Sequence, residues 1–177
     1  MKFVALDDGD DSTMNYEDTA FFNERDRLIA IAQDRGLPIK QRIHKLCEAS
    51  ERELPDYSFA EWTSILLSLE RLDSTWDDVL DRAAKNERMH EIDGIQFEQL
   101  LVYFLYRHLS SAEDDYEISL YTLFAVISSQ IICDIAARTD LPITEAARMY
   151  SSEVEYSEDN TSALLDVIDE NTSTIVM

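Results

Sequence analysis

The stretch that decides the fold runs from Ile118 to Cys133 and reads ISLYTLFAVISSQIIC. None of its residues is charged, and apolar side chains occupy every face of the helix that it would form. A helix that is apolar nearly all round is normally enclosed by its neighbours. The stretch is shorter than the roughly 20 apolar residues that cross a membrane, and it contains several hydroxyl and amide side chains. It therefore predicts the buried central helix of a globular domain, and we expect no membrane partner.

The composition around this helix predicts an all-α, single-domain helical bundle. With 177 residues, of which 45% are apolar and 10% aromatic, the chain can fill one sizeable core. Three glycines and three prolines are few, which favours long helices with short connections over a β-sandwich or barrel. We expect about seven or eight helices around a central helix at about residues 113–138, in one domain at residues 15–170. An acidic flexible lead at residues 1–14 and a frayed tail at residues 171–177 complete the expected organisation.

Start and stop signals divide the chain into further helices. Ser58 and Glu61 have the spacing of a capping box, in which each side chain accepts a hydrogen bond from an unpaired backbone N–H of the first turn. Ser74 and Asp77 repeat that spacing. Besides the central helix, apolar residues three and four apart predict helices at about residues 16–34, 39–52, 59–72, 75–89, 96–109, 144–154 and 161–169.

The charge of the chain is strongly negative and unevenly distributed. The formal net charge is −22 and the pI is about 4.2. Seven of the 15 basic residues lie in one early stretch, namely Arg25, Arg27, Arg35, Lys40, Arg42, Lys45 and Arg52. After residue 88 there are three arginines against seventeen acids. Because like charges repel in a compact chain, this imbalance favours either an unusual, salt-rich solvent or a positively charged partner.

The candidate catalytic and metal-ligating residues form no recognisable site. His44 and Cys47 are three residues apart on one predicted helix, but a zinc ion requires more ligands than this pair supplies. His90 and Glu91 begin a metalloprotease helix motif, yet the second histidine is absent. His108 continues the apolar face of its helix. We therefore expect no metal, no cofactor and no enzymatic activity.

Two further features bear on location. Cys47 and Cys133 fall within apolar helical patterns, where an unpaired thiol usually behaves as a small hydrophobic group. The first eleven residues become acidic at once and lack the basic start and apolar run of a signal peptide. We expect a cytoplasmic protein in a reducing compartment.

Direct binding to nucleic acid is not expected. Residues 135–150 have the helix–break–helix outline of a DNA-binding motif. However, the second helix offers Arg148 against Glu145 and Glu153, and its acids would repel phosphates.

The leading functional hypothesis is an acidic protein–protein interaction module. Carboxylates one helical turn apart are separated by roughly 6 Å and can form rows of negative charge that resemble a phosphate backbone. Such a module would be an inhibitor or nucleic-acid-mimicking decoy in the basic groove of a nucleic-acid-handling protein. The residues expected to bind this partner are Glu113, Asp114, Asp115, Glu117, Glu145, Glu153, Glu155, Glu158 and Asp159.

The alternative is a helical accessory or homo-oligomeric structural subunit whose acids serve only solubility. It could assemble through an apolar patch, with the basic stretch at residues 25–52 meeting an acidic face of another copy. The later half is rich in tyrosine, which is favoured at interfaces. These tyrosines are Tyr103, Tyr106, Tyr116, Tyr121, Tyr150 and Tyr156. The sequence leaves the oligomeric state open.

Overall fold

The computed structural model describes residues 16–87 and 92–172, with side chains from Asn23 onward. The expected acidic lead and most of the expected tail lie outside these residues. The described chain contains eight α-helices, one π-helical turn and no strand, which confirms the all-α prediction. The elements are α1 (Tyr16–Ala32), α2 (Ile39–Ala49), α3 (Phe59–Ser68), α4 (Thr75–Lys85), α5 (Gly94–Leu109), α6 (Asp115–Thr139), α7 (Ile143–Tyr150), η1 (Ser151–Glu155) and α8 (Glu158–Asn171).

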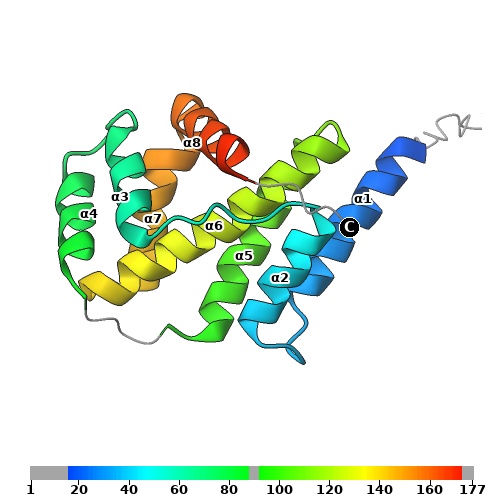
Figure 1. Cartoon of the computed structure of the whole chain (residues 1–177), viewed down its shortest axis with the longest axis horizontal. Helices are drawn as coiled ribbons and strands as arrows, with labels where there is room; N and C mark the ends of the chain where they lie inside the picture. Colours follow the sequence, from blue (N-terminus) through cyan, green and yellow to red (C-terminus); the bar gives the residue numbers. More distant parts are fainter. Residues whose placement is uncertain (1–15, 88–91, 173–177) are drawn as a thin grey trace, which may run out of the picture.

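Helix α6 is the central helix of the bundle, as predicted (Figure 1). It packs against α2, α3, α4, α5, α7 and α8, and it buries an almost continuous run of side chains from Thr122 to Ala137. Among the described residues it is the one helix long and apolar enough to cross a bilayer, and 72% of that window is buried inside the protein. Its enclosure by neighbouring helices accounts for its apolar composition.

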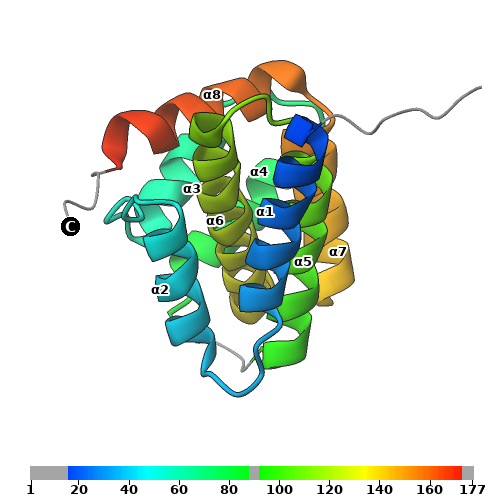
Figure 2. The same ribbon diagram turned by 90° about the vertical axis from the view of Figure 1, so that its right-hand side faces the viewer.

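The other helices surround α6 on several sides. Helices α1 and α2 lie at one end of the molecule and α3, α4 and α7 at the other, while α5 packs along α6 (Figure 1). Helix α8 crosses over the end of the bundle at which α6 begins (Figure 2). This arrangement places the end of α8 beside the first turn of α6.

Side chains cap several of the helix starts, but one predicted cap was wrong. Ser58 and Glu61 form the expected capping box: Ser58 Oγ accepts from Glu61 N, and Glu61 Oε2 accepts from Ser58 N. At α4 the Ser74 side chain makes no cap bond, because Asp73 Oδ1 accepts from Thr75 N at 2.9 Å in its place. At α6 the cap is Asp114, whose Oδ1 accepts from Glu117 N at 2.8 Å.

Helices α3 and α4 both end earlier than expected. Helix α3 ends at Ser68 and not at residue 72, because the connection that follows is bonded to distant side chains. Glu70 N donates to Asn160 Oδ1 at 2.8 Å, and Leu72 N donates to Glu153 Oε2 at 2.9 Å. Side chains from the C-terminal part of the chain therefore replace the helical hydrogen bonds of this segment. Helix α4 likewise ends early, at Lys85.

The expected helix at residues 144–154 becomes α7 followed by the π-helical turn η1. In η1 the Tyr156 N–H donates to the Ser151 carbonyl, five residues back, at 3.0 Å. A π-helical turn accommodates one extra residue and changes the direction in which the following side chains point. Helix α8 then starts three residues earlier than expected, because Ser157 Oγ accepts from Asn160 N at 3.2 Å.

Candidate functional site

The candidate site is a surface of unpaired carboxylates on α8 and at the start of α6. Glu158, Asp166 and Glu170 are exposed on α8 and lie eight and then four residues apart, so they share one stripe with steps of roughly 12 and 6 Å. Asp159 lies beside this stripe, and no Lys or Arg occurs after residue 148. The loop before α6 and its first turn add three more exposed acids. We call the whole set the acidic face: Glu113, Asp114, Asp115, Glu158, Asp159, Asp166 and Glu170.

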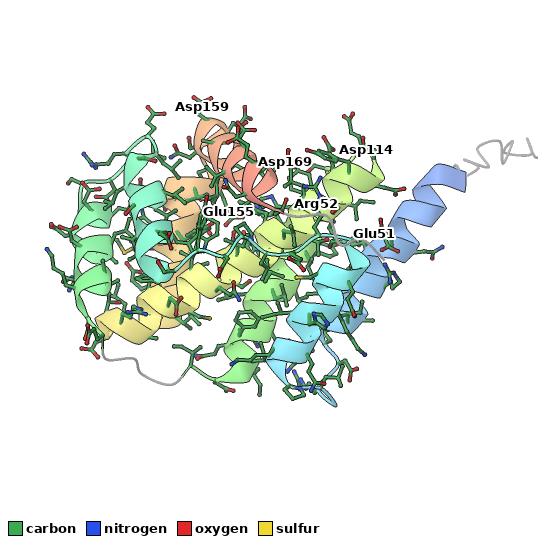
Figure 3. All side chains as sticks on the ribbon, in the orientation of Figure 1. Glu51, Arg52, Asp114, Glu155, Asp159 and Asp169 are labelled. Carbon is green, nitrogen blue, oxygen red and sulfur yellow. The ribbon has the colours of Figure 1, made fainter. Side chains whose placement is uncertain are left out.

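A polar junction joins the end of α8 to the start of α6, so the two elements that carry these acids are in contact. Tyr116 Oη donates to Asp169 Oδ2 at 2.5 Å, and Arg52 Nη1 donates to Asp169 Oδ1 at 2.6 Å. The Arg52 guanidinium also lies 4.6 Å from the centre of the Tyr116 ring. Figure 3 shows Asp159, Asp169 and Asp114 in succession along the upper edge of the molecule.

The same junction neutralises Arg52. The hydrogen bond from Tyr116 and that from Arg52 lower the pKa of Asp169, so Asp169 is a carboxylate at neutral pH and offsets the Arg52 charge. None of the seven carboxylates of the acidic face makes an ion pair with any residue that the structure describes. The surface is therefore strongly negative.

A cleft of about 540 Å³ between α1, α2 and α6 adjoins the acidic face. Arg52, Asp115 and Tyr116 line it together with Glu51, whose backbone adopts a left-handed conformation with a φ of 54°. Within the described chain, the carboxylates of Glu51 and Asp115 have no hydrogen-bond or ion-pair partner. The cleft thus has two uncompensated negative groups beside apolar wall atoms, an environment that suits a Lys or Arg side chain.

The structure brings five of the nine predicted partner-binding residues onto the acidic face: Glu113, Asp114, Asp115, Glu158 and Asp159. Glu117 is half-buried and accepts from Glu113 N at 2.8 Å. Glu145 lies on α7 and pairs with Arg148 at 2.7 Å. Glu153 and Glu155 are buried inside the fold, so we leave them out of the proposed surface. Sequence reasoning did not select Asp166 and Glu170, although the absence of any base after residue 148 was a usable signal.

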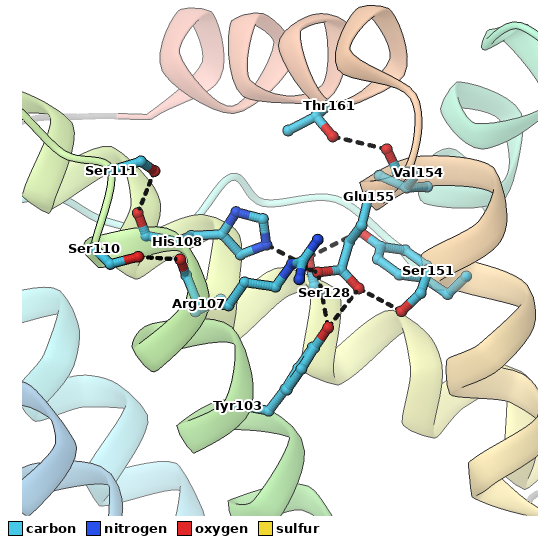
Figure 4. A network of polar contacts seen from close by, with 12 residues as sticks. Tyr103, Arg107, His108, Ser110, Ser111, Ser128, Ser151, Val154, Glu155 and Thr161 are labelled. Carbon is cyan, nitrogen blue, oxygen red and sulfur yellow. Dashed lines mark hydrogen bonds and ion pairs between the residues drawn. The ribbon is translucent and has the colours of Figure 1, made fainter.

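Glu155 is the centre of a buried polar network that joins η1 to α5 (Figure 4). Its side chain is 1% exposed, and Oε1 accepts from Arg107 Nε at 2.9 Å and from His108 Nε2 at 3.1 Å. Ser151 Oγ donates to the other oxygen, and the more distant Tyr103 Oη donates to either oxygen, at 3.4 Å from Oε1 and 3.5 Å from Oε2. Burial alone would raise the pKa of Glu155, but the bonds from His108 and Ser151 and the Arg107 charge lower it overall.

This network does not have the geometry of nucleophilic catalysis. A serine nucleophile requires a base within hydrogen-bond reach, and that base is oriented by a third group. Here Ser151 and His108 both donate to the same carboxylate, so no hydrogen bond joins them to each other. The network fixes the path of the chain between α7 and α8.

Glu153 and Asn160 hold the α3–α4 connection against the C-terminal part of the chain. Glu153 is 3% exposed and accepts from Leu72 N, while its Oε1 has no hydrogen-bond partner in the described structure. Asn160 Nδ2 donates to the carbonyls of Glu70 at 2.8 Å and Glu153 at 2.7 Å. Glu153 lies in helical phase with the buried residues Met149 and Tyr150, which was a signal of its burial. No comparable signal exists for Glu155, because the π-helical turn changes the phase.

Most arginines of the basic stretch at residues 25–52 form hydrogen bonds or ion pairs with other residues of the same chain. Arg42 is 8% exposed and donates both to Glu98 Oε2 and to the Ala32 carbonyl at 2.9 Å. Arg35 pairs with Glu98 at 2.8 Å, and its hydrogen bond is the main cause of the lowered pKa of Glu98. Lys40 and Lys45 are exposed and make no ion pair with described residues. This stretch therefore joins α1, α2 and α5 and leaves few free cations for another copy.

The described residues contain no group of three His, Cys, Asp or Glu side chains that could hold a metal ion. His44 is exposed beside Glu48, at 3.3 Å, whereas Cys47 is buried, so the two do not share a face. Burial raises the pKa of Cys47 to about 11 and that of Cys133 to about 12, which keeps both as thiols. His90 and Glu91 lie outside the described residues.

Comparisons with known proteins found no match to any family model, curated protein or solved structure. The fold and the site together describe an acidic helical bundle. Its exposed carboxylates lie on helices that the Tyr116–Asp169–Arg52 junction holds together.

Proposed function

We propose that this protein is an acidic protein–protein interaction module that binds a basic protein surface through the acidic face. In its most concrete form, it is an inhibitor or decoy that occupies the basic groove of a nucleic-acid-handling protein. The observation that carries the proposal is the set of seven exposed carboxylates that make no ion pair with any described residue, together with the pairing of the nearby Arg52 with Asp169.

A groove that binds nucleic acid presents Lys and Arg side chains to neutralise phosphates. The stripe on α8 offers carboxylates along the length of the helix, and the start of α6 adds further negative charge. The Tyr116–Asp169–Arg52 junction supports the proposal because a fixed surface loses little conformational entropy on binding. The neighbouring cleft adds a place for one basic side chain of the partner.

A second candidate function, a helical accessory or oligomeric subunit, is favoured by exposed tyrosines. Tyr106 and Tyr156 are 60% and 76% exposed, which is unusual for large aromatic side chains. Sedimentation at low and high protein concentration separates self-assembly from the decoy function, because a strict monomer at both concentrations would exclude the former.

The experiment that tests the decoy function compares two variants that lose the same charge at different places. Proteins that bind a heparin column are passed over the immobilised protein, and a retained partner is purified and titrated against each variant. The face variant removes three carboxylates of the acidic face by Asp159→Asn, Asp166→Asn and Glu170→Gln. The control variant removes three exposed, unpaired carboxylates elsewhere by Asp56→Asn, Asp78→Asn and Glu87→Gln.

The proposal expects the face variant to bind the partner at least about tenfold more weakly than the control, since each lost contact removes some of the counterion-linked affinity. Binding of the wild type should weaken by orders of magnitude between low and moderate salt, and duplex DNA should compete for the partner. Equal affinity of the two variants, or association that does not respond to salt, would contradict it.

A further inference from the structure

An aromatic hollow of about 350 Å³ opens between α3, α5 and α6, away from the acidic face. Its walls carry four aromatic rings and one carboxylate from segments that are distant in the sequence. The residues that line it are Tyr57, Phe59, Trp62, Phe97, Gln130, Ile131, Cys133 and Asp134. A volume of this size is typical of a small-ligand site.

Two of the rings meet at nearly a right angle. The centres of Tyr57 and Trp62 are 5.1 Å apart and their planes are inclined by 80°. Perpendicular rings can present their negative π faces to the same cation from different sides. Phe59 already has a cationic neighbour, because the Arg138 guanidinium lies 4.6 Å from its ring centre. Arg138 itself does not line the hollow.

Asp134 supplies the charge of the hollow. Its side chain is partly buried, and burial raises its pKa although Arg138 acts in the opposite direction. It makes no hydrogen bond or ion pair with any described residue. The neighbouring Cys133 is a neutral thiol, so Asp134 is the only anionic group in the lining. A carboxylate held in this environment gains from a cation that enters the hollow and replaces the lost water.

We propose that the aromatic hollow binds a methylated ammonium group, on a free molecule such as choline or on a trimethylated lysine side chain. A primary ammonium or guanidinium would need several hydrogen-bond acceptors to replace its water, and the side chains of the lining offer few of them, namely Asp134, the Gln130 amide and the Tyr57 hydroxyl. A methylated ammonium has no such requirement and binds to aromatic faces through its charge. This proposal does not depend on the acidic face or on its partner.

The test follows the two tryptophan indole N–H signals by NMR at constant ionic strength. The probes are choline chloride, N-acetyl-trimethyllysine methylamide and 3,3-dimethylbutanol, the uncharged isostere of choline. Trp62 lines the hollow, whereas Trp76 on α4 is buried elsewhere and serves as an internal reference. We expect both cations, or one of them, to shift the Trp62 signal in a saturable manner, and the isostere to have little effect. The cation that binds more tightly identifies the source of the ligand.

Two variants test the assignment. Asp134→Asn removes the charge and should weaken cation binding by about 3- to 30-fold, and Tyr57→Leu, at a half-buried position, should weaken it to a similar extent. Asp78→Asn, on α4, is the matched control and should bind as the wild type does. The proposal is overturned if neither cation shifts Trp62 at tens of millimolar, if the isostere binds equally well, or if Asp134→Asn binds like the control.

Discussion

At the scale of single residues, Glu155 offers the sharpest test of how the buried acids contribute. Glu155→Gln keeps the size of the side chain but removes the charge that Arg107 and His108 bond to. We expect the free energy of unfolding to fall by about 1–3 kcal/mol, the usual range for hydrogen bonds to a charged group. Urea denaturation followed by circular dichroism measures this change.

The matched control is Glu145→Gln, which breaks the exposed pair with Arg148 on α7. Exposed pairs contribute little, so this variant should stay within about 0.5 kcal/mol of the wild type. If both variants lost the same stability, the effect would come from the change in net charge and not from the network.

The difference in unfolding free energy between the wild type and Glu155→Gln should depend on pH in a definite direction. The folded protein lowers the pKa of Glu155 below its ordinary value of 4.5, so the carboxylate stabilises the fold above that pH. This stabilisation is lost as the pH falls through the lowered pKa, where Glu155 becomes protonated and resembles glutamine. We therefore expect the stability gap between wild type and Glu155→Gln to be full at pH 7 and to close in acid. A gap that stayed constant down to pH 3 would show that ionisation of Glu155 is irrelevant.

At the scale of elements, the helix starts give a prediction that the sequence alone gets wrong. Ser58 and Ser74 have the same spacing to an acid, but only Ser58 bonds to the backbone of its helix. Ser58→Ala should therefore cost about 1 kcal/mol, whereas Ser74→Ala should be nearly neutral. Thermal unfolding of both variants checks this difference, and Asp73→Ala should show the cost that Ser74→Ala lacks. Equal costs for Ser58→Ala and Ser74→Ala would contradict the assigned caps.

The central helix and the capping box could be predicted because their signals are local. A stretch without charges predicts burial, and a serine three residues before a glutamate predicts a cap. The end of α3 could not be predicted, because it depends on Asn160 and Glu153, some ninety and eighty residues away in the chain. Half of the candidate site follows from counting charges after residue 148. The aromatic hollow could not be found this way, since it joins Tyr57, Phe97 and Asp134 only after folding.

The π-helical turn explains why Glu155, an acid of the predicted site, is internal, whereas the neighbouring Glu153 is buried by the phase of α7. In a continuous α-helix from residue 143, Glu155 would lie about 100° around the axis from Val154. The extra residue in η1 turns Glu155 towards α5, while Glu153 keeps the phase of α7 and reaches the α3–α4 connection. One local irregularity thus connects three parts of the bundle and directs the exposed acids of α8 to solvent.

At the scale of the whole molecule, the net charge of −22 predicts opposite effects of salt on stability and on partner binding. Repulsion among unpaired carboxylates destabilises the compact chain, and salt screens it. The Debye length falls from about 30 Å at 0.01 M to about 10 Å at 0.1 M ionic strength. We expect the free energy of unfolding to rise on the order of 1 kcal/mol over this range, with little further change at higher salt. Urea denaturation at a series of NaCl concentrations measures it.

The shape of that salt response separates the decoy from a protein whose acids serve only solubility in a salt-rich solvent. A salt-adapted fold would be unstable at low salt and would continue to gain stability up to molar concentrations. The described ion pairs of Arg42, Arg52 and Arg107 are buried or partly buried and are screened less than surface pairs, so they should hold the fold together in dilute buffer. If the protein is already folded at low salt and releases its partner as salt rises, its acidic residues serve binding. If the protein unfolds in dilute buffer, its acidic residues are instead an adaptation to a salt-rich solvent.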